Sequence, residues 1–146
     1  MTVTATRGKS ELQELMDRCE HAALATWALD CAQRVLPLFA GSCLGDGRPE
    51  QAIETGRAWV RGELPMWQAR KQAFAAHAAA REAQCPAAVA AARSAGQALG
   101  AVHVRGHATY AAEYARKAVA LAAGNAEEER QWQIKHLREL IQVQTE

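Results

Sequence analysis

The chain has 146 residues, which is enough for one domain to bury a hydrophobic core without disulfide or metal staples. Hydrophobic residues make up 49% and charged residues 23%, the composition of a globular protein and not of a disordered one. The formal net charge of +1 lacks the strongly basic balance of a nucleic-acid-binding domain. No apolar run reaches the roughly 18 residues of a membrane span, and the start lacks a signal-peptide core. We therefore expect a cytoplasmic protein with no nucleic-acid or membrane partner.

Helical periodicity dominates the chain, and no segment alternates polar and apolar residues as a strand would. We expect an all-α fold, a single-domain bundle of six to seven closely packed helices over residues 10–146, after nine frayed residues. Capping residues, prolines and glycines divide the helices from one another. The expected boundaries are a start at Ser10, a helix from His21 that Pro37 kinks or stops, a loop from Gly41 to Gly47, first turns at Pro49, Pro65 and Pro86, a cap at Thr109 and a final start at Asn125.

Alanine is concentrated between Ala69 and Ala123, where two helix faces should pack closely. One face holds the alanines that follow Pro65, and the next helix carries Gly96 and Gly100 on one side. Each mid-helix glycine costs roughly 1 kcal/mol relative to alanine, so a closely approaching helix is expected in compensation. The following helix is expected to turn Tyr110, Tyr114 and Leu121 inward.

Three histidines fall where helix faces should be buried. His77 borders the alanine face, while His103 and His107 continue the glycine stripe one turn apart on a predicted single helix. Such a pair can bind a divalent metal, and His77 and Asp30 are the further ligands we would expect. The alternative is a structural role, because buried histidines usually hydrogen-bond to neighbouring groups and fix helix register. The expected partners for that role are Asp30, Arg81 and Tyr110 or Tyr114.

Charged residues offer several further pairs. Asp30 and Arg34 are four residues apart, the spacing of a solvated ion pair along a helix. Asp46 precedes a predicted helix start, and Arg48 can clamp it or a neighbouring carboxylate through two hydrogen bonds. This pair either pins the loop or contacts a ligand or partner. Arg57 and Arg81 are long side chains that can pair inward with acids such as Asp30.

Catalytic and cofactor-binding motifs are not evident in the sequence. Ser94 lacks the glycine elbow of a nucleophile, and the loop from Gly41 to Gly47 lacks the Gly-Lys-Ser/Thr ending of a phosphate loop. The spacing of the four cysteines does not match a zinc knuckle, so we expect structural thiols.

Five blocks taken in order resemble a family of bacterial immunity proteins of polymorphic toxin systems, the immunity-protein-five-like family. The blocks are Leu24–Phe39, Asp46–Ile53, Arg57–Glu63, Phe74–Arg81 and Gly96–Ala108, within a similarity that runs from about Leu24 to Val119. The resemblance implies a small, helical, cytoplasmic protein with no active site. The motif positions that it carries over are Trp27, Asp30, Cys31, Arg34, Asp46, Arg48, Pro49, Arg57, Trp59, His77, Arg81, His103 and His107.

The leading hypothesis is therefore an immunity protein that binds and neutralises a cognate toxin, without catalysis and without a cofactor. Two alternatives stay open. One is a metal-dependent enzyme built on His77, His103 and His107, with Asp30 as a fourth ligand or base. The other is a structural helical module that self-associates as a homo-oligomer.

Overall fold

The computed structural model describes residues 10–145, which form seven helices and no strand, as the all-α expectation requires. The expectation of a frayed segment over residues 1–9 lies outside the described residues. The helices are α1 (Glu11–Asp17), α2 (His21–Ala40), α3 (Arg48–Val60), α4 (Met66–Glu82), α5 (Pro86–Gly100), α6 (His107–Leu121) and α7 (Ala126–Thr145). Within this part of the chain, none of the helices has the length and apolar character needed to cross a membrane.

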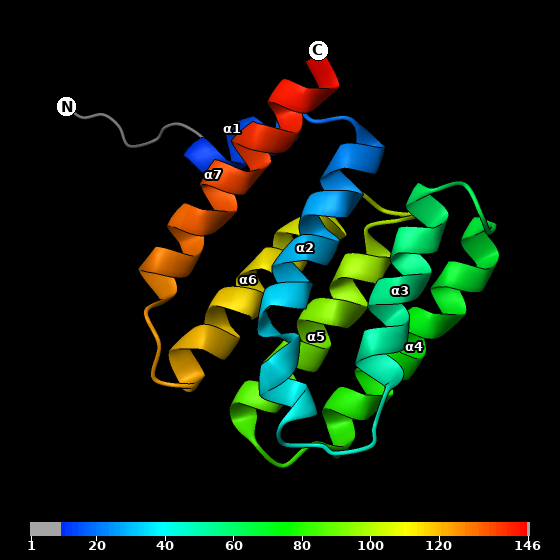
Figure 1. The fold of residues 1–146 in the computed structure, drawn as a ribbon, viewed down its shortest axis with the longest axis vertical. Helices are drawn as coiled ribbons and strands as arrows, with labels where there is room; N and C mark the ends of the chain where they lie inside the picture. Colours follow the sequence, from blue (N-terminus) through cyan, green and yellow to red (C-terminus); the bar gives the residue numbers. More distant parts are fainter. Residues whose placement is uncertain (1–9, 146) are drawn as a thin grey trace.

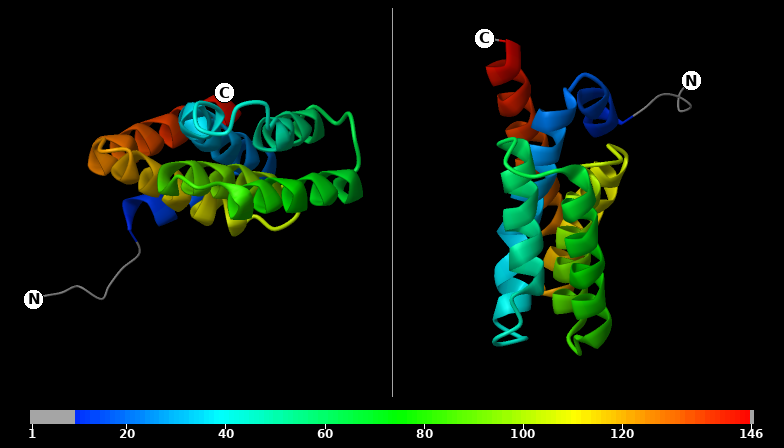
Figure 2. Two further views of the ribbon diagram at one scale, coloured as in Figure 1. Left: turned by 90° about the horizontal axis from the view of Figure 1, so that it is seen from below. Right: turned by 90° about the vertical axis from the view of Figure 1, so that its right-hand side faces the viewer.

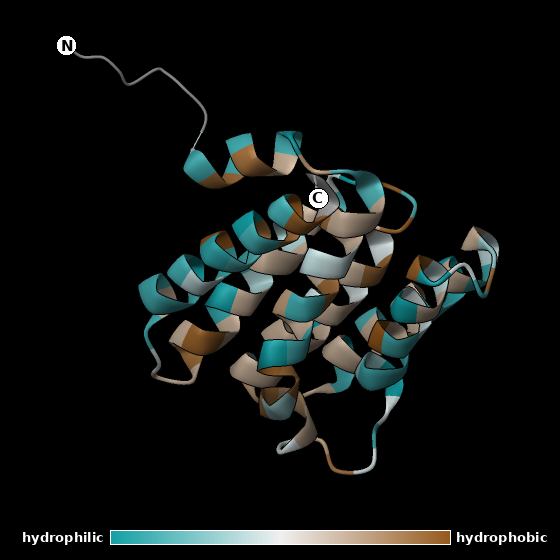
Figure 3. Cartoon of the chain, turned by 45° about the horizontal axis from the view of Figure 1, so that its top comes forward, coloured by the Kyte–Doolittle hydropathy of each residue, from teal (hydrophilic) through white to brown (hydrophobic). Residues whose placement is uncertain are grey.

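The helices form two layers, which Figure 2 shows edge-on in its left view. One layer contains α7, α2 and α3 side by side, and the other contains α6, α5 and α4 behind them (Figure 1). The short helix α1 lies across one end of the bundle, next to α7. Hydrophobic and hydrophilic residues alternate along the helices, as expected when each helix turns one side to a shared core (Figure 3).

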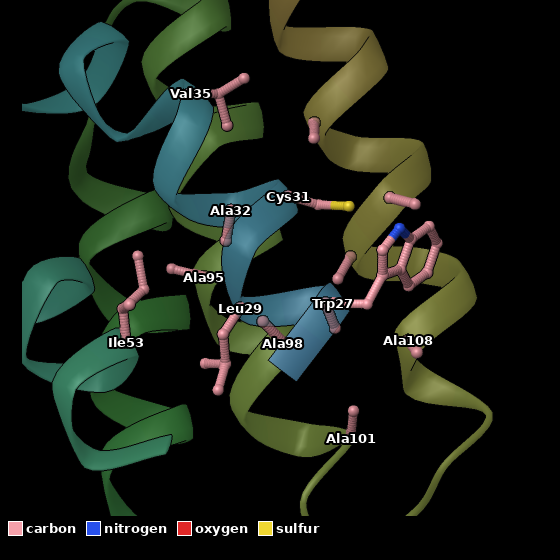
Figure 4. Packing of buried hydrophobic residues seen from close by; sticks show 14 of the residues in the cluster. Trp27, Leu29, Cys31, Ala32, Val35, Ile53, Ala95, Ala98, Ala101 and Ala108 are labelled. Atoms are coloured by element: carbon pink, nitrogen blue, oxygen red, sulfur yellow. The ribbon is translucent and has the colours of Figure 1, made fainter. Parts of the chain in front are cut away.

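The most extensive contact between the two layers joins α2 and α5, and small side chains contribute much of it. Ala32 of α2 and Ala95 and Ala98 of α5 are fully buried (Figure 4). Ala28 of α2 is fully buried as well. Trp27 is the largest buried side chain, and it points from α2 toward α6. The small side chains let the helix backbones approach closely, and Trp27 fills the wider space beside them.

Most of the predicted helix boundaries are confirmed, because they depend on a capping residue or a proline within one turn of the helix start. The Ser10 hydroxyl accepts a hydrogen bond from the Gln13 amide at 3.1 Å, and the Asn125 side chain accepts one from the Glu128 amide at 3.1 Å. Pro49 and Pro86 occupy the first turns of α3 and α5. Pro37 lies inside α2, which continues to Ala40 and ends within a turn of it.

Two predictions about the region after α5 are wrong. The helix α5 ends at Gly100 and α6 begins at His107, so His103 and His107 do not share a helix. Thr109 is not a cap, because Gly106 occupies the N-cap position of α6. A tight turn over residues 101–106 separates the two helices, and no proline or asparagine marks it in the sequence.

Three buried glycines occupy close approaches between side chains and helix backbone. A Cβ atom added to Gly96 would lie 2.6 Å from the Nε2 atom of His77, and one added to Gly100 would lie 2.9 Å from the Nδ1 atom of His107. A Cβ atom added to Gly56 would lie 2.5 Å from a methyl carbon of Leu29. The close approach expected at Gly96 is thus present, and what Gly96 accommodates is a histidine ring of α4.

Replacing Gly56 by alanine is expected to lower the free energy of unfolding. Leu29 is fully buried and cannot move aside without displacing its neighbours. Overpacking typically costs about 1–3 kcal/mol, which alanine's helix propensity of roughly 1 kcal/mol offsets only in part. The wild-type chain is the reference for this comparison. Urea denaturation of both proteins measures the effect, and equal stabilities would contradict the packing described at Gly56.

Candidate functional site

A network of charged and aromatic side chains joins α2, α3 and α7 on the outer side of their layer. Arg57 of α3 pairs with the Asp30 Oδ1 atom at 2.9 Å, as the sequence suggested. The Nε2 atom of His136 on α7 donates to the Asp30 Oδ2 atom at 2.7 Å. Asp30 therefore has partners on both neighbouring helices and does not form the predicted pair with Arg34.

Arg34 instead reaches α7. Its Nε and Nη2 atoms donate to the two carboxylate oxygens of buried Glu129 at 2.7 and 3.0 Å, which raises the pKa of the guanidinium. The same guanidinium lies 4.1 Å from the centroid of the Trp132 ring, and that ring stacks on His136 at 4.8 Å. The network is therefore continuous from Arg57 to Glu129, and its charges neutralise one another.

The loop between α2 and α3 is held by the predicted clamp of Arg48 on Asp46. The Arg48 Nε and Nη2 atoms donate to the Asp46 carboxylate at 2.9 and 2.7 Å, and these bonds hold the pKa of Asp46 below its usual value. Arg48 Nη2 also donates to Glu82 of α4 at 2.7 Å. These contacts tie the loop to the end of α4, which agrees with a pinning role for the pair.

The three histidines come together at the C-terminal half of α5, although they arise from three different segments. Arg93 of α5 donates to the His77 Nδ1 atom at 3.0 Å, and the Nδ1 atom of His107 donates to the Gln97 side chain at 2.7 Å. The ring centroids of His103 and His107 are 6.0 Å apart. The predicted partners were wrong: Arg93 and Gln97, both on α5, take the place of Asp30, Arg81 and the two tyrosines.

These surroundings favour the neutral form of two of the rings. Burial lowers the pKa of His77, and the charges of Arg93 and Arg81 lower it further. Burial and the charge of Arg70 similarly lower the pKa of His103. The Nδ1 atom of His103 is itself buried and lacks a hydrogen-bond partner in the part of the chain that the structure describes.

The metal site considered for His77, His103, His107 and Asp30 is not formed by these four residues. Asp30 belongs to the other layer, where Arg57 and His136 engage both of its oxygens. The Nδ1 atom of His77 already accepts a hydrogen bond from a cation. Among residues 10–145, no three His, Cys, Asp or Glu side chains are grouped in a way that could hold a metal ion.

The outer side of the α4–α5–α6 layer has a different character, which we call the cationic face. Its cations are Arg70 and Arg81 of α4, Arg93 of α5 and Lys117 of α6. The proximity of Arg70 to His103, and of Arg81 and Arg93 to His77, places three of them around the histidines. Lys117 lies with Arg93 along a groove between α5 and α6.

The sequence explains why these cations have few acidic neighbours. Residues 66–121 contain seven Lys or Arg residues and two Glu, a net charge of +5 in a chain whose total is +1. Glu82 bonds to Arg48 and is also within reach of the charge of Arg81, and Glu113 lies beside residues of α1 and α7. The cationic face therefore presents charge that the fold itself does not neutralise.

Large apolar and aromatic side chains are exposed on the same face. Phe74 is 67% exposed, Tyr110 52% and Leu121 48%. The expectation that Tyr110 and Leu121 point inward is wrong, because Ala111 and Ala118 occupy the buried side of α6 and let it lie close to α5. Exposed aromatic residues among arginines are typical of protein–protein interfaces.

Sequence reasoning missed His136, Glu129, Trp132, Arg93 and Lys117. The first three lie on a helix more than ninety residues from their partners, so no local spacing reveals them. Arg93 and Lys117 were detectable, because the charge of residues 66–121 differs from that of the whole chain. Averaging over the full length concealed this asymmetry.

The two layers of the bundle thus differ, because one carries a network of paired charges and the other the cationic face. The chain belongs to the family described as Imm-5 like putative immunity protein, whose model matches residues 14–140. The match covers most of the chain and confirms the resemblance drawn from the sequence blocks. No curated protein and no solved structure matches the chain significantly.

The depressed histidine pKa values predict a pH dependence of stability. His77 and His103 have folded-state pKa values below the ordinary 6.5, so the unfolded chain binds more protons as the pH falls past that value. Their contribution is present above pH 6.5 and is lost as the pH falls through the folded pKa values. The double variant His77→Gln/His103→Gln should therefore lose less stability than the wild type between pH 7 and pH 5. Chemical denaturation at each pH measures the free energy of unfolding of both proteins. The same dependence of that free energy on pH in the variant and the wild type would contradict the prediction.

Proposed function

We propose that the chain is an immunity protein that acts in the cytoplasm and neutralises a cognate toxin by non-covalent binding. The family to which the chain belongs supports this function. The observation that carries the proposal is the cationic face, where Phe74 and Tyr110 are exposed and the four cations form no ion pair within residues 10–145. Aromatic and arginine side chains provide most of the binding energy in protein interfaces.

The same face supports a mechanism of inhibition by covering the partner. Complementary charge guides the encounter and fixes the orientation of two proteins, while exposed apolar groups add affinity when they become buried. The helices beneath the face are fixed by close alanine packing. Binding would therefore lose little free energy to the ordering of the backbone. The opposite layer is less suited, because its charges already pair with one another.

The two rival functions are less well supported. A metal-dependent activity would need donors that Arg57, His136 and Arg93 already engage. Self-association through the cationic face would bring like charges together, which opposes binding. We therefore do not propose either of them.

Co-expression with the toxin encoded beside this chain tests the proposed function. The wild-type chain should restore growth and should co-purify with the toxin. The variant Arg70→Glu/Arg81→Glu should weaken binding more than tenfold, because like-charge contacts cost several kcal/mol and about 1.4 kcal/mol is a factor of ten. Both side chains are exposed, so the fold should be retained.

The control is Lys135→Glu, a charge reversal at an exposed residue of α7 that forms no ion pair in residues 10–145. It should bind the toxin nearly as well as the wild type. A wild-type chain that neither binds the toxin nor restores growth would contradict the proposal. Light scattering without the toxin tests the rival, since a stable homo-oligomer assembled through the cationic face would favour self-association.

A further inference from the structure

A solvent-open groove runs between the beginning of α5 and the end of α6, within the cationic face. Its volume is about 430 Å³. Val89 and Ala90 line it from α5, and Tyr114 and Leu121 line it from α6, so its walls are mainly apolar. This volume lies in the range of pockets that enclose a drug-sized molecule, and it has room for more than one apolar side chain.

Two cations, Arg93 and Lys117, also line the groove. Arg93 has a neutral acceptor in His77, and the Lys117 ammonium lies 6.0 Å from the centroid of the Tyr114 ring. No carboxylate is among the residues that line the groove, and neither cation forms an ion pair in residues 10–145. An occupant with negative charge beside an apolar group would therefore satisfy both kinds of lining residue.

We propose that this groove docks an acidic segment of a partner protein, with an apolar side chain inserted between Val89 and Leu121 and flanking carboxylates paired with Arg93 and Lys117. This inference rests on the proposed function and names the kind of partner surface that the cationic face recognises. Charge complementarity supports an acidic occupant, since the layer carries +5. The groove is continuous with the rest of the face through the bond between Arg93 and His77.

The chemistry of the groove favours a protein segment over a nucleic acid. Single-stranded nucleic acids gain much of their affinity from bases stacked on aromatic faces. Val89, Ala90 and Leu121 are aliphatic and offer no such face, and Lys117 lies over the ring of Tyr114. An aliphatic groove with a cation on each helix is better matched to leucine or phenylalanine beside aspartate or glutamate.

Three synthetic peptides test the groove directly on the full chain, labelled with nitrogen-15. The probe is acetyl-Glu-Asp-Leu-Phe-Asp-Glu-amide, and the two comparison peptides replace its acids by lysine or its Leu-Phe by Ala-Ala. The probe should shift the amide signals of Val89, Arg93, Tyr114 and Leu121, and both comparison peptides should bind at least about tenfold more weakly, a change of roughly 1.4 kcal/mol. Lys117→Glu should weaken binding of the probe to a similar extent, whereas the matched variant Lys135→Glu should leave it unchanged.

Several results would overturn the inference. The probe could fail to bind, all three peptides could bind equally, or the signal shifts could lie away from α5 and α6. An oligothymidylate could also shift the amide signals of the groove residues when the acidic peptide does not. Leu121→Ala provides a second variant that should fold, because this side chain is already half exposed. This variant should bind the probe more weakly than the wild type does, with an unchanged melting temperature.

The toxin assay separates this inference from the function on which it rests. If Lys117→Glu/Leu121→Ala still neutralises the toxin as well as the wild type, the groove is not the docking site and the immunity function stands. If the wild type fails to bind the toxin although the groove binds the acidic peptide, the proposed function is contradicted and the acidic specificity of the groove is supported. If this variant no longer neutralises the toxin although its stability is unchanged, the result supports both the immunity function and the groove as the docking site.

Discussion

The close packing of α2 against α5 is the contact on which the rest of the structure depends. Alanines on both helices, including Ala32, Ala95 and Ala98, are fully buried and bring the two backbones near each other. The same small residues line the buried sides of α4 and α6. Because these narrow interfaces have no room for large side chains, Phe74 and Tyr110 remain at the surface. The composition of the core thus determines the composition of the cationic face.

Alanine surfaces fit together in several registers, so polar contacts are needed to select one. The Ser94 hydroxyl donates to the Ala111 carbonyl at 2.8 Å, which fixes α5 against α6. The buried Gln133 side chain donates to the Ala112 carbonyl at 3.1 Å, and the backbone carbonyl of Gln133 accepts a hydrogen bond from the Trp27 indole at 2.9 Å. These bonds join α6, α7 and α2 through groups that are fully buried and satisfied. Each of these hydrogen bonds requires a particular alignment of donor and acceptor, so it selects one register of the helices. The apolar contacts around it do not have this requirement.

The sequence predicts the fold well where the determining interaction is local. Ser10, Pro49 and Asn125 mark helix starts because a cap or a fixed φ angle acts within one turn. The boundary between α5 and α6 escaped prediction because His103 and His107 happen to keep helical spacing across a turn. Tyr110 was misplaced for a related reason: hydrophobic character favours burial, but the adjacent alanines fit the interface better.

The candidate site was predicted only in part, because its contacts join distant segments. The clamp of Arg48 on Asp46 spans two residues and was evident, and the pairing of Arg57 with Asp30 could be suggested from charge alone. The bond between Arg34 and Glu129 depends on how α7 lies along α2, which no spacing encodes. The three histidines were rightly grouped as a cluster, but Arg93 and Gln97 surround them because α5 turns these residues toward α4 and α6.

The division of charge between the two layers also makes the molecule an electric dipole. Residues 66–121 carry +5, whereas the helices α2, α3 and α7 together carry −1, so the α4–α5–α6 layer is the positive side of a nearly neutral protein. A dipole experiences a torque in the field of another charged body, even when the net attraction between them is small. Such a molecule would turn its α4–α5–α6 layer toward a negative surface before contact is made. Dissolved salt would reduce mainly this alignment during an encounter, because it screens charges that are farther apart than the Debye length of about 8 Å at physiological ionic strength.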